Sequence, residues 1–175
     1  MSAVTTVLGS RPFTRADLDA MPDDGRRHEL IDGVLVVTPA PSDRHQIVSM
    51  ALGLAIAPAL PGHLRVLAAP FDVLLAGDSA ASGDTVTQPD LIVAPKESIK
   101  RRGLPGAPLL AIEILSASTR RFDLIVKRAR YEEAGCAHYW VVDPDEPRII
   151  AWELQDGAYV EVADVAGDDE LELER

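Results

Sequence analysis

The chain has 175 residues, enough for one globular domain, which at this size buries roughly 70% of its unfolded surface. Hydrophobic residues make up 47% and charged residues 26%, a composition that excludes a disordered chain. The net charge of −11 argues against a protein that coats nucleic acid through charge alone, and the single cysteine, Cys136, excludes an internal disulfide and a zinc site built from a cysteine cluster.

A reducing cytoplasm is the expected compartment, because disulfides are typical of secreted proteins and this chain cannot form one internally. Residues 1–10 lack the basic region and long apolar stretch of a signal peptide. The most apolar segment, residues 47–60, contains Pro58 and is shorter than the ~20 residues that a membrane span needs. We therefore expect no membrane partner and interpret this segment as a core helix.

The first half of the chain is expected to alternate helices with paired strands. Thr14, with Asp17 three residues later, predicts the start of a short helix. Asp32-Gly33 lies between two β-rich runs and predicts a hairpin, because this turn requires positive φ at both positions. The elements expected here are a helix at 14–20, strands at 28–31 and 34–37, a helix at 43–57, strands at 65–69 and 71–76, and a loop of small residues at 80–87.

The second half of the chain contains longer apolar runs. Pro89 introduces one strand, Glu113 interrupts another, and Gly135 is placed to end a helix. The elements expected here are a strand at 90–94, a polar connection at 96–106, a strand at 109–115, a helix at 118–134, and strands at 138–142, 148–154 and 159–162.

This order of elements predicts an α/β (α+β) fold, with a mixed sheet flanked by helices. We expect a single domain over residues 1–175. Its core would span about residues 13–162, followed by an acidic tail at 163–175.

Glu113 is the most informative residue, because it lies within an apolar run typical of a strand buried on both faces. A carboxylate there loses its hydration at a cost of several kcal/mol unless a cation or another partner compensates. Two alternatives stay open for Glu113: an edge strand that turns its side chain to water, or a buried ion pair with an arginine.

Asp90 stands at the opening of another apolar strand, directly after Pro89. A Pro-Asp pair alone is also common in turns. If Asp90 and Glu113 lie on neighbouring strands, their mutual repulsion favours a divalent cation between them. Ligands made only of oxygen suit Mg²⁺ or Mn²⁺ rather than zinc.

Lys127 lies on the predicted helix four residues after Asp123. An apolar stripe of that helix places both residues on its far side. The simplest interpretation is an exposed i, i+4 ion pair worth about 0.3–0.5 kcal/mol. The alternative is that Lys127 lies in a polar cleft and stabilises a phosphate or orients a water. The stripe consists of Phe122, Ile125, Val126 and Ala129.

Several short motifs follow one another in a characteristic order: Glu29-Leu30-Ile31-Asp32-Gly33, His45, Pro89-Asp90-Leu91, residues 113–119, Asp123, Lys127, Tyr131, Gly135 and residues 139–143. Together they resemble the Uma-two family of endonucleases, which is similar to the PD-(D/E)XK nuclease superfamily that includes restriction enzymes. The resemblance covers residues 13–159, and it rests on order and spacing rather than on any one motif. It implies a restriction-endonuclease-like fold with an N-terminal helix and hairpin.

The resemblance also implies roles for individual residues. Asp90 and Glu113 match the two metal-binding acids, and Glu29 matches an acid that helps bind the metal or position water. Lys127 matches a lysine carried on the helix, whereas the wider superfamily has it two residues after the second acid, where this chain has Leu115. His45 and Tyr131 match polar positions in the substrate cleft.

The function that these residues imply is hydrolysis of DNA phosphodiester bonds with Mg²⁺ or Mn²⁺. Arg120 and Arg121, together with residues 100–102, would contact phosphates. A homodimer is expected, because two cuts need two sites. The alternative is a catalytically inactive domain that binds nucleic acid or protein. A sugar hydrolase using paired carboxylates is disfavoured, because aromatic residues make up only 5% of the chain.

Overall fold

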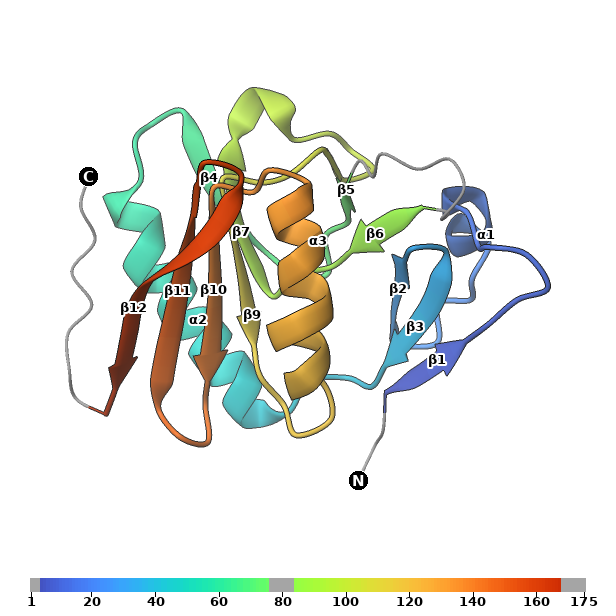
Figure 1. Cartoon of the computed structure of the whole chain (residues 1–175), viewed down its shortest axis with the longest axis horizontal. Coiled ribbons are helices and arrows are strands. Elements are labelled where there is room, and N and C mark those ends of the chain that lie inside the picture. Colours follow the sequence, from blue (N-terminus) through green and yellow to red (C-terminus); the bar gives the residue numbers. More distant parts are fainter. Residues whose placement is uncertain (1–3, 76–83, 168–175) are drawn as a thin grey trace.

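The computed structural model describes residues 4–75 and 84–167, and in this part of the chain it shows a mixed α+β fold with two six-stranded sheets and three α-helices (Figure 1). The sequence predicted one central sheet. The fold class is therefore confirmed in its coarse form, while the strands divide into two sheets that stand side by side. No helix in these two ranges combines the length and the hydropathy needed to span a bilayer.

The first sheet contains the N-terminal hairpin and has the strand order β1-β3-β2-β6-β5-β8. Its neighbouring strands run antiparallel except for the parallel pair β5 and β8. Its strands are β1 (Thr5–Val7), β2 (Arg27–Ile31), β3 (Val34–Thr38), β5 (Val73–Leu75), β6 (Thr85–Thr87) and β8 (Leu104–Pro105).

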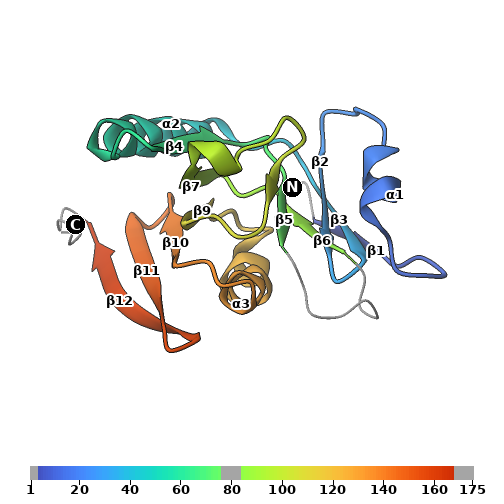
Figure 2. The same cartoon turned by 90° about the horizontal axis from the view of Figure 1, so that it is seen from above.

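The second sheet has the strand order β12-β11-β10-β9-β7-β4, and only β9 and β10 run parallel. The helices α2 and α3 cover its opposite faces (Figure 2). Its strands are β4 (Leu64–Ala68), β7 (Leu91–Pro95), β9 (Leu110–Ile114), β10 (His138–Asp143), β11 (Arg148–Gln155) and β12 (Ala158–Ala166).

The helices are α1 (Arg15–Asp19), α2 (Asp43–Ile56) and α3 (Arg128–Glu133). A π-helical segment, Phe122–Lys127, leads directly into α3. Short 3-10 turns occupy Ala57–Ala59 and Lys96–Ser98.

Local signals in the sequence predicted the ends and turns of several of these elements correctly. Thr14 caps α1, and its side chain and that of Asp17 satisfy each other's backbone N–H groups. The hairpin turns at Asp32 and Gly33, with φ of 52° and 71°. Gly135, with φ of 79°, follows the end of α3. These three predictions are confirmed.

Three expectations about the elements are wrong. The helix at 43–57 is not a core helix, because α2 has no buried residue and Ile47, Met50 and Leu54 are 66–69% exposed. Residues 85–87 form the buried strand β6 rather than a loop, while 80–83 lie outside the described residues. The last strand extends to Ala166, so it includes part of the segment expected to be a tail.

Alternation along β9 decides where Glu113 points. Ile112 and Ile114 pack in the cluster that contacts α2, whereas Ala111 packs on the α3 side. Glu113 has the same parity as Ala111 in the strand, so its side chain faces the π-helical segment and α3. The strand is buried on both faces, as the apolar run predicted.

Candidate functional site

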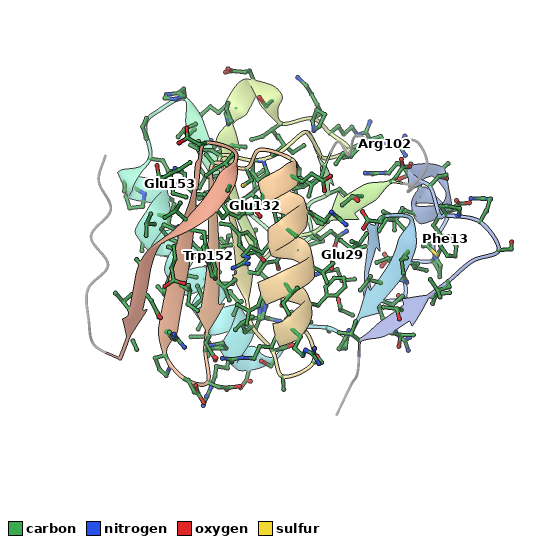
Figure 3. The ribbon with its side chains drawn as sticks, viewed as in Figure 1. Phe13, Glu29, Arg102, Glu132, Trp152 and Glu153 are labelled. Carbon is green, nitrogen blue, oxygen red and sulfur yellow. The ribbon has the colours of Figure 1, made fainter. Side chains whose placement is uncertain are left out.

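The acidic residues of the candidate site come from three separate parts of the fold. Glu29 lies on β2 of the first sheet, and Glu113 lies on β9 of the second. Asp90 directly precedes β7, the neighbour of β9. In Figure 3, Glu29 lies where the hairpin of β2 and β3 approaches the π-helical segment and α3. The site therefore forms at the junction of the two sheets.

Lys127 is the cation at the centre of this junction. Its Nζ atom lies 2.9 Å from Glu29 Oε1, 3.1 Å from Glu113 Oε1 and 3.7 Å from Asp123 Oδ1. Its side chain is only 3% exposed, and the three carboxylates are equally buried. The exposed i, i+4 ion pair considered from the sequence is therefore wrong.

Asp123 and Lys127 lie in a π-helical segment and point inward. The backbone N–H of Arg128 donates to the carbonyl of Asp123, five residues back, which widens the turn. The hydroxyl of Tyr139 donates to the same carbonyl at 2.9 Å. Asp123 and Lys127 are the buried residues of this segment, whereas Ile125 is 58% exposed. The stripe predicted with α-helical spacing is therefore not the buried face.

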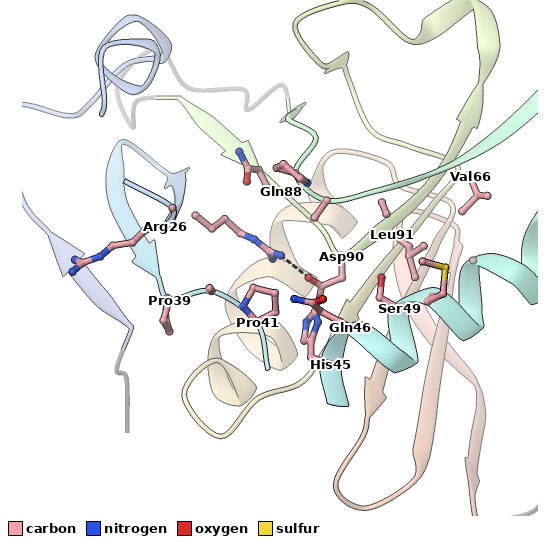
Figure 4. A pocket seen from close by; sticks show the side chains of 18 of the residues that line it. Arg26, Pro39, Pro41, His45, Gln46, Ser49, Val66, Gln88, Asp90 and Leu91 are labelled. Atoms are coloured by element: carbon pink, nitrogen blue, oxygen red, sulfur yellow. Dashed lines mark hydrogen bonds and ion pairs between the residues drawn. The ribbon is translucent and has the colours of Figure 1, made fainter. Parts of the chain in front are cut away.

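Asp90 is held by three donors on its own side of the pocket. Arg27 Nη2 donates to Oδ1 at 2.8 Å, and the backbone N–H of Ile114 donates to Oδ2 at 2.7 Å. His45 Nε2 lies 3.0 Å from the same Oδ2 atom (Figure 4). The arginine partner that was considered for Glu113 is thus found on Asp90, and Glu113 pairs with Lys127 instead.

The charges of the cluster shift the pKa values in opposite directions. Burial alone would raise the pKa of Asp90, but the His45 hydrogen bond and the Arg27 charge lower it to about 2. Burial raises the pKa of Glu113 well above its ordinary value, against the opposing charge of Lys127. Burial likewise raises the pKa of Asp123 to about 6. One ammonium group therefore does not offset all the carboxylates around it.

Burial also acts against the charge on Lys127. The nearby carboxylates of Glu113, Glu29 and Asp123 outweigh that effect and hold the pKa of Lys127 above its ordinary value. In the metal-free protein these carboxylates therefore favour the charged form of Lys127, which suits it to stabilising negative charge.

A pocket of about 190 Å³, which we call the acidic pocket, opens onto these groups. Of the residues proposed from the sequence, it is lined by Glu29, His45, Asp90, Glu113 and Lys127. Residues 39–42 and Ser116, Ser118 and Thr119 also line it.

Three proposed substrate-binding residues lie elsewhere. Tyr131 is fully buried, and its hydroxyl is 2.7 Å from Thr87 Oγ1. Arg120 donates to Asp143, and Arg121 is exposed without lining this pocket. None of these three residues lines the acidic pocket. Their contacts with substrate stay predictions.

Arg27 is the polar residue of the site that sequence reasoning missed. It stands two residues before Glu29 on β2, and alternate residues of a strand share a face. That spacing was the available signal. Asp123 was noticed only as a partner in a surface ion pair, and nothing in the sequence indicated the π-helical turn that buries it.

The donor set suits a hard divalent cation. The pocket is lined by four carboxylates and two cations. The carboxylates are Glu29, Asp90, Glu113 and Asp123, and the cations are Arg27 and Lys127. Mg²⁺ is often held by one or two carboxylates plus water and substrate oxygens, which this excess of negative charge matches. Within the described ranges, however, no three His, Cys, Asp or Glu side chains are already grouped to hold an ion. Lys127 Nζ lies among the acids instead.

The fold is similar to that of a protein of known structure. A crystal structure from Anabaena variabilis, described as "a putative nuclease belonging to DUF820", matches with a TM-score of 0.73 over 94% of this chain and 90% of that chain. Sequence identity is 19%, so the likeness shows the fold alone. No curated protein gave a match.

The family assignment comes from the sequence. Residues 15–175 match the Uma2 family, described as "Putative restriction endonuclease". The match covers most of the chain, so the protein belongs to the Uma2 family. The resemblance stated from the motifs is thereby confirmed.

Proposed function

We propose that this protein is a metal-dependent endonuclease that hydrolyses phosphodiester bonds in DNA, with a restriction-endonuclease-like arrangement of its site. One observation carries the proposal: acids from β2, from the start of β7 and from β9 converge with Lys127 on one pocket. Active sites typically bring buried charged residues from separate elements together, although burying these charges lowers the stability of the fold.

Asp90 and Glu113 would hold Mg²⁺ or Mn²⁺, and Glu29 would add a further oxygen ligand or position water. The bound ion would lower the pKa of a water and offset charge on the phosphate. These three residues have ligand oxygens of the type that such ions prefer. All three line the same pocket.

The cations of the chain would act on the phosphate itself. Lys127, charged and fixed by packing, would stabilise negative charge as it develops on the phosphoryl oxygens. Arg27 would exchange its bond to Asp90 for a bond to a phosphate oxygen, because a guanidinium suits both partners. His45 would hold Asp90 in position through the contact of 3.0 Å.

The test uses the purified protein with supercoiled, linear and branched DNA in Mg²⁺ or Mn²⁺. Asp90→Asn and Glu113→Gln should abolish cutting while leaving circular dichroism unchanged. Asp143→Asn is the matched control, because Asp143 is a buried carboxylate outside the pocket. Equal cutting by all four proteins would show that this pocket does not carry the reaction.

A second candidate function is a domain that binds nucleic acid without cutting it. The observation that favours it is the saturation of Asp90 by Arg27, His45 and the Ile114 amide, which leaves less access for a metal. Binding of DNA by the wild type with no cutting of any substrate would select this candidate.

A homodimer is part of the proposal. The exposed apolar side chain of Ile47 on α2 supplies a contact that self-association would cover. Sedimentation of the wild type beside Ile47→Lys tests it, since a charge on this face should shift a dimer towards monomer. A wild type that sediments as a monomer would remove this part of the proposal.

A further inference from the structure

A second and larger cavity adjoins the acidic pocket. It measures about 810 Å³, within the range of roughly 300–1,000 Å³ typical of small-molecule sites. It runs between α2 and β4, and we call it the α2 groove (Figure 4). Both cavities are lined by Arg27, residues 39–41, His45 and Asp90, so the α2 groove is continuous with the acidic pocket.

The walls of the α2 groove combine apolar surface with neutral hydrogen-bonding groups. Its apolar side chains are Met50, Leu54, Val66, Pro70 and Leu91. Its neutral polar side chains are Gln46, Ser49 and Gln88. A nucleobase has the matching properties, with two apolar faces and an edge of donors and acceptors that amides and hydroxyls can bind.

Charge argues against a duplex as the occupant. The α2 groove contains two acids, Asp23 and Asp90, against two arginines, Arg26 and Arg27. The whole chain carries a net charge of −11. Binding along a duplex backbone depends on many basic contacts with phosphates. Affinity in this groove must therefore come mainly from contacts with bases.

The burial of the acids in the smaller pocket also favours an unpaired strand over a duplex. Asp90 and Glu113 are 3% and 1% exposed, at the inner end of the narrower pocket. A phosphodiester that approaches Glu113 has to enter that pocket, and the nucleotide attached to it then has to occupy adjoining space. A paired base is held within its duplex, whereas an unpaired base is free to follow its phosphate.

We propose that the α2 groove binds an unpaired base of the DNA strand whose phosphodiester enters the acidic pocket. The inference rests on the proposed nuclease function and narrows its substrate class to single-stranded DNA or DNA with unpaired nucleotides at the cut. Met50 and Leu54 cover the base faces, and Gln46 and Ser49 contact its edge.

Binding is measured by fluorescence anisotropy of a labelled single-stranded oligonucleotide and of the blunt duplex of the same sequence, in Ca²⁺, with strand integrity checked on a gel. The single strand should bind at least about 10-fold more tightly, because the apolar walls of the groove remove the faces of an unpaired base from water and a small buried apolar area is enough for that factor. Ser49→Leu, which fills part of the groove without adding an aromatic ring or a charge, should lose most of that advantage, and Gln46→Ala part of it. Ala55→Leu is the control on α2, because Ala55 is exposed and lies outside the groove.

Each result bears on the inference separately from the nuclease proposal. Equal binding of single strand and duplex, no binding of either, or no effect of both groove variants would overturn it, provided that the variants melt cooperatively like the wild type. Groove-dependent binding without cutting in Mg²⁺ or Mn²⁺ would keep the groove and end the nuclease proposal. Cutting of blunt duplex by Ser49→Leu at the wild-type rate would do the reverse.

Discussion

The Nζ atom of Lys127 lies 2.9 Å from Oε1 of Glu29, across the boundary between the two sheets. The same ammonium group is 3.1 Å from Glu113. It therefore provides, in the metal-free protein, part of the positive charge that a divalent ion would bring. A metal ion bound as proposed would compete with Lys127 for the same carboxylate oxygens, and the first prediction follows from that competition.

Lys127→Met should destabilise the metal-free protein by about 3–5 kcal/mol, the usual cost of removing one partner from a buried ion pair. Mn²⁺ should restore more stability to the variant than to the wild type, because the ion no longer competes with the ammonium group. Urea unfolding in EDTA and in Mn²⁺ measures both effects. Arg121→Met serves as the control, since Arg121 is exposed on the same helical segment. A variant that Mn²⁺ stabilises no more than the wild type would contradict the competition.

Asp123 should make the stability of the metal-free protein depend on pH. Its folded pKa of about 6 lies above the ordinary value of 3.8, mainly because of burial. A raised pKa means that the folded state holds the proton more tightly, so this contribution is complete below pH 3.8 and is lost as pH rises through about 6. The full difference corresponds to about 3 kcal/mol.

Asp123→Asn should remove much of that loss, so its stability should fall less between about pH 4 and pH 7 than that of the wild type. Chemical denaturation in EDTA at several pH values gives the comparison. Asp145→Asn, at an exposed position outside the acidic pocket, is the control. Parallel curves for wild type and Asp123→Asn would show that another group causes the dependence.

Asp90 should show the opposite dependence. Its folded pKa of about 2 lies below 3.8, so its contribution to stability is present above pH 3.8 and is lost as pH falls through about 2. Arg27→Gln removes one of the groups that lower this pKa. We expect a loss of about 1.5–3 kcal/mol at pH 7, the range for a hydrogen bond to a charged group. The loss should shrink near pH 2.5, and an equal loss at both pH values would contradict the assigned partner.

The sequence predicted most of the local structure because short-range chemistry sets it. The cap at Thr14, the turn at Asp32-Gly33 and the end of the helix before Gly135 each depend on a few neighbouring residues. The buried strand around Glu113 was equally clear from its apolar run. The division into two sheets depends on pairings between distant segments, such as β2 with β6, and no local pattern encodes them.

The periodicity of apolar residues did not predict which residues of the helices are buried. The apolar stripe at a period of 3.6 residues predicted that Ile125 faces the core, but Ile125 is 58% exposed and the face with Asp123 and Lys127 is buried. Apolar composition likewise predicted a buried α2, although a helix that covers one face of a sheet exposes the residues on its outer side. Both errors concern how an element is rotated against its neighbours, which tertiary contacts decide.

Tyr131 gives a final test that separates packing from substrate contact. Its hydroxyl is 2.7 Å from Thr87 Oγ1 in the interior, and its ring stacks on Tyr139 with centroids 5.2 Å apart. Tyr131→Phe keeps the ring and removes only the hydrogen bond, so it should cost about 1 kcal/mol of stability and leave DNA binding unchanged. Thr87→Val should cost a similar amount, because it breaks the same bond from the other side. Thermal denaturation and anisotropy of the two variants provide the measurements. A loss of DNA binding in Tyr131→Phe but not in Thr87→Val would restore the substrate contact expected from the sequence.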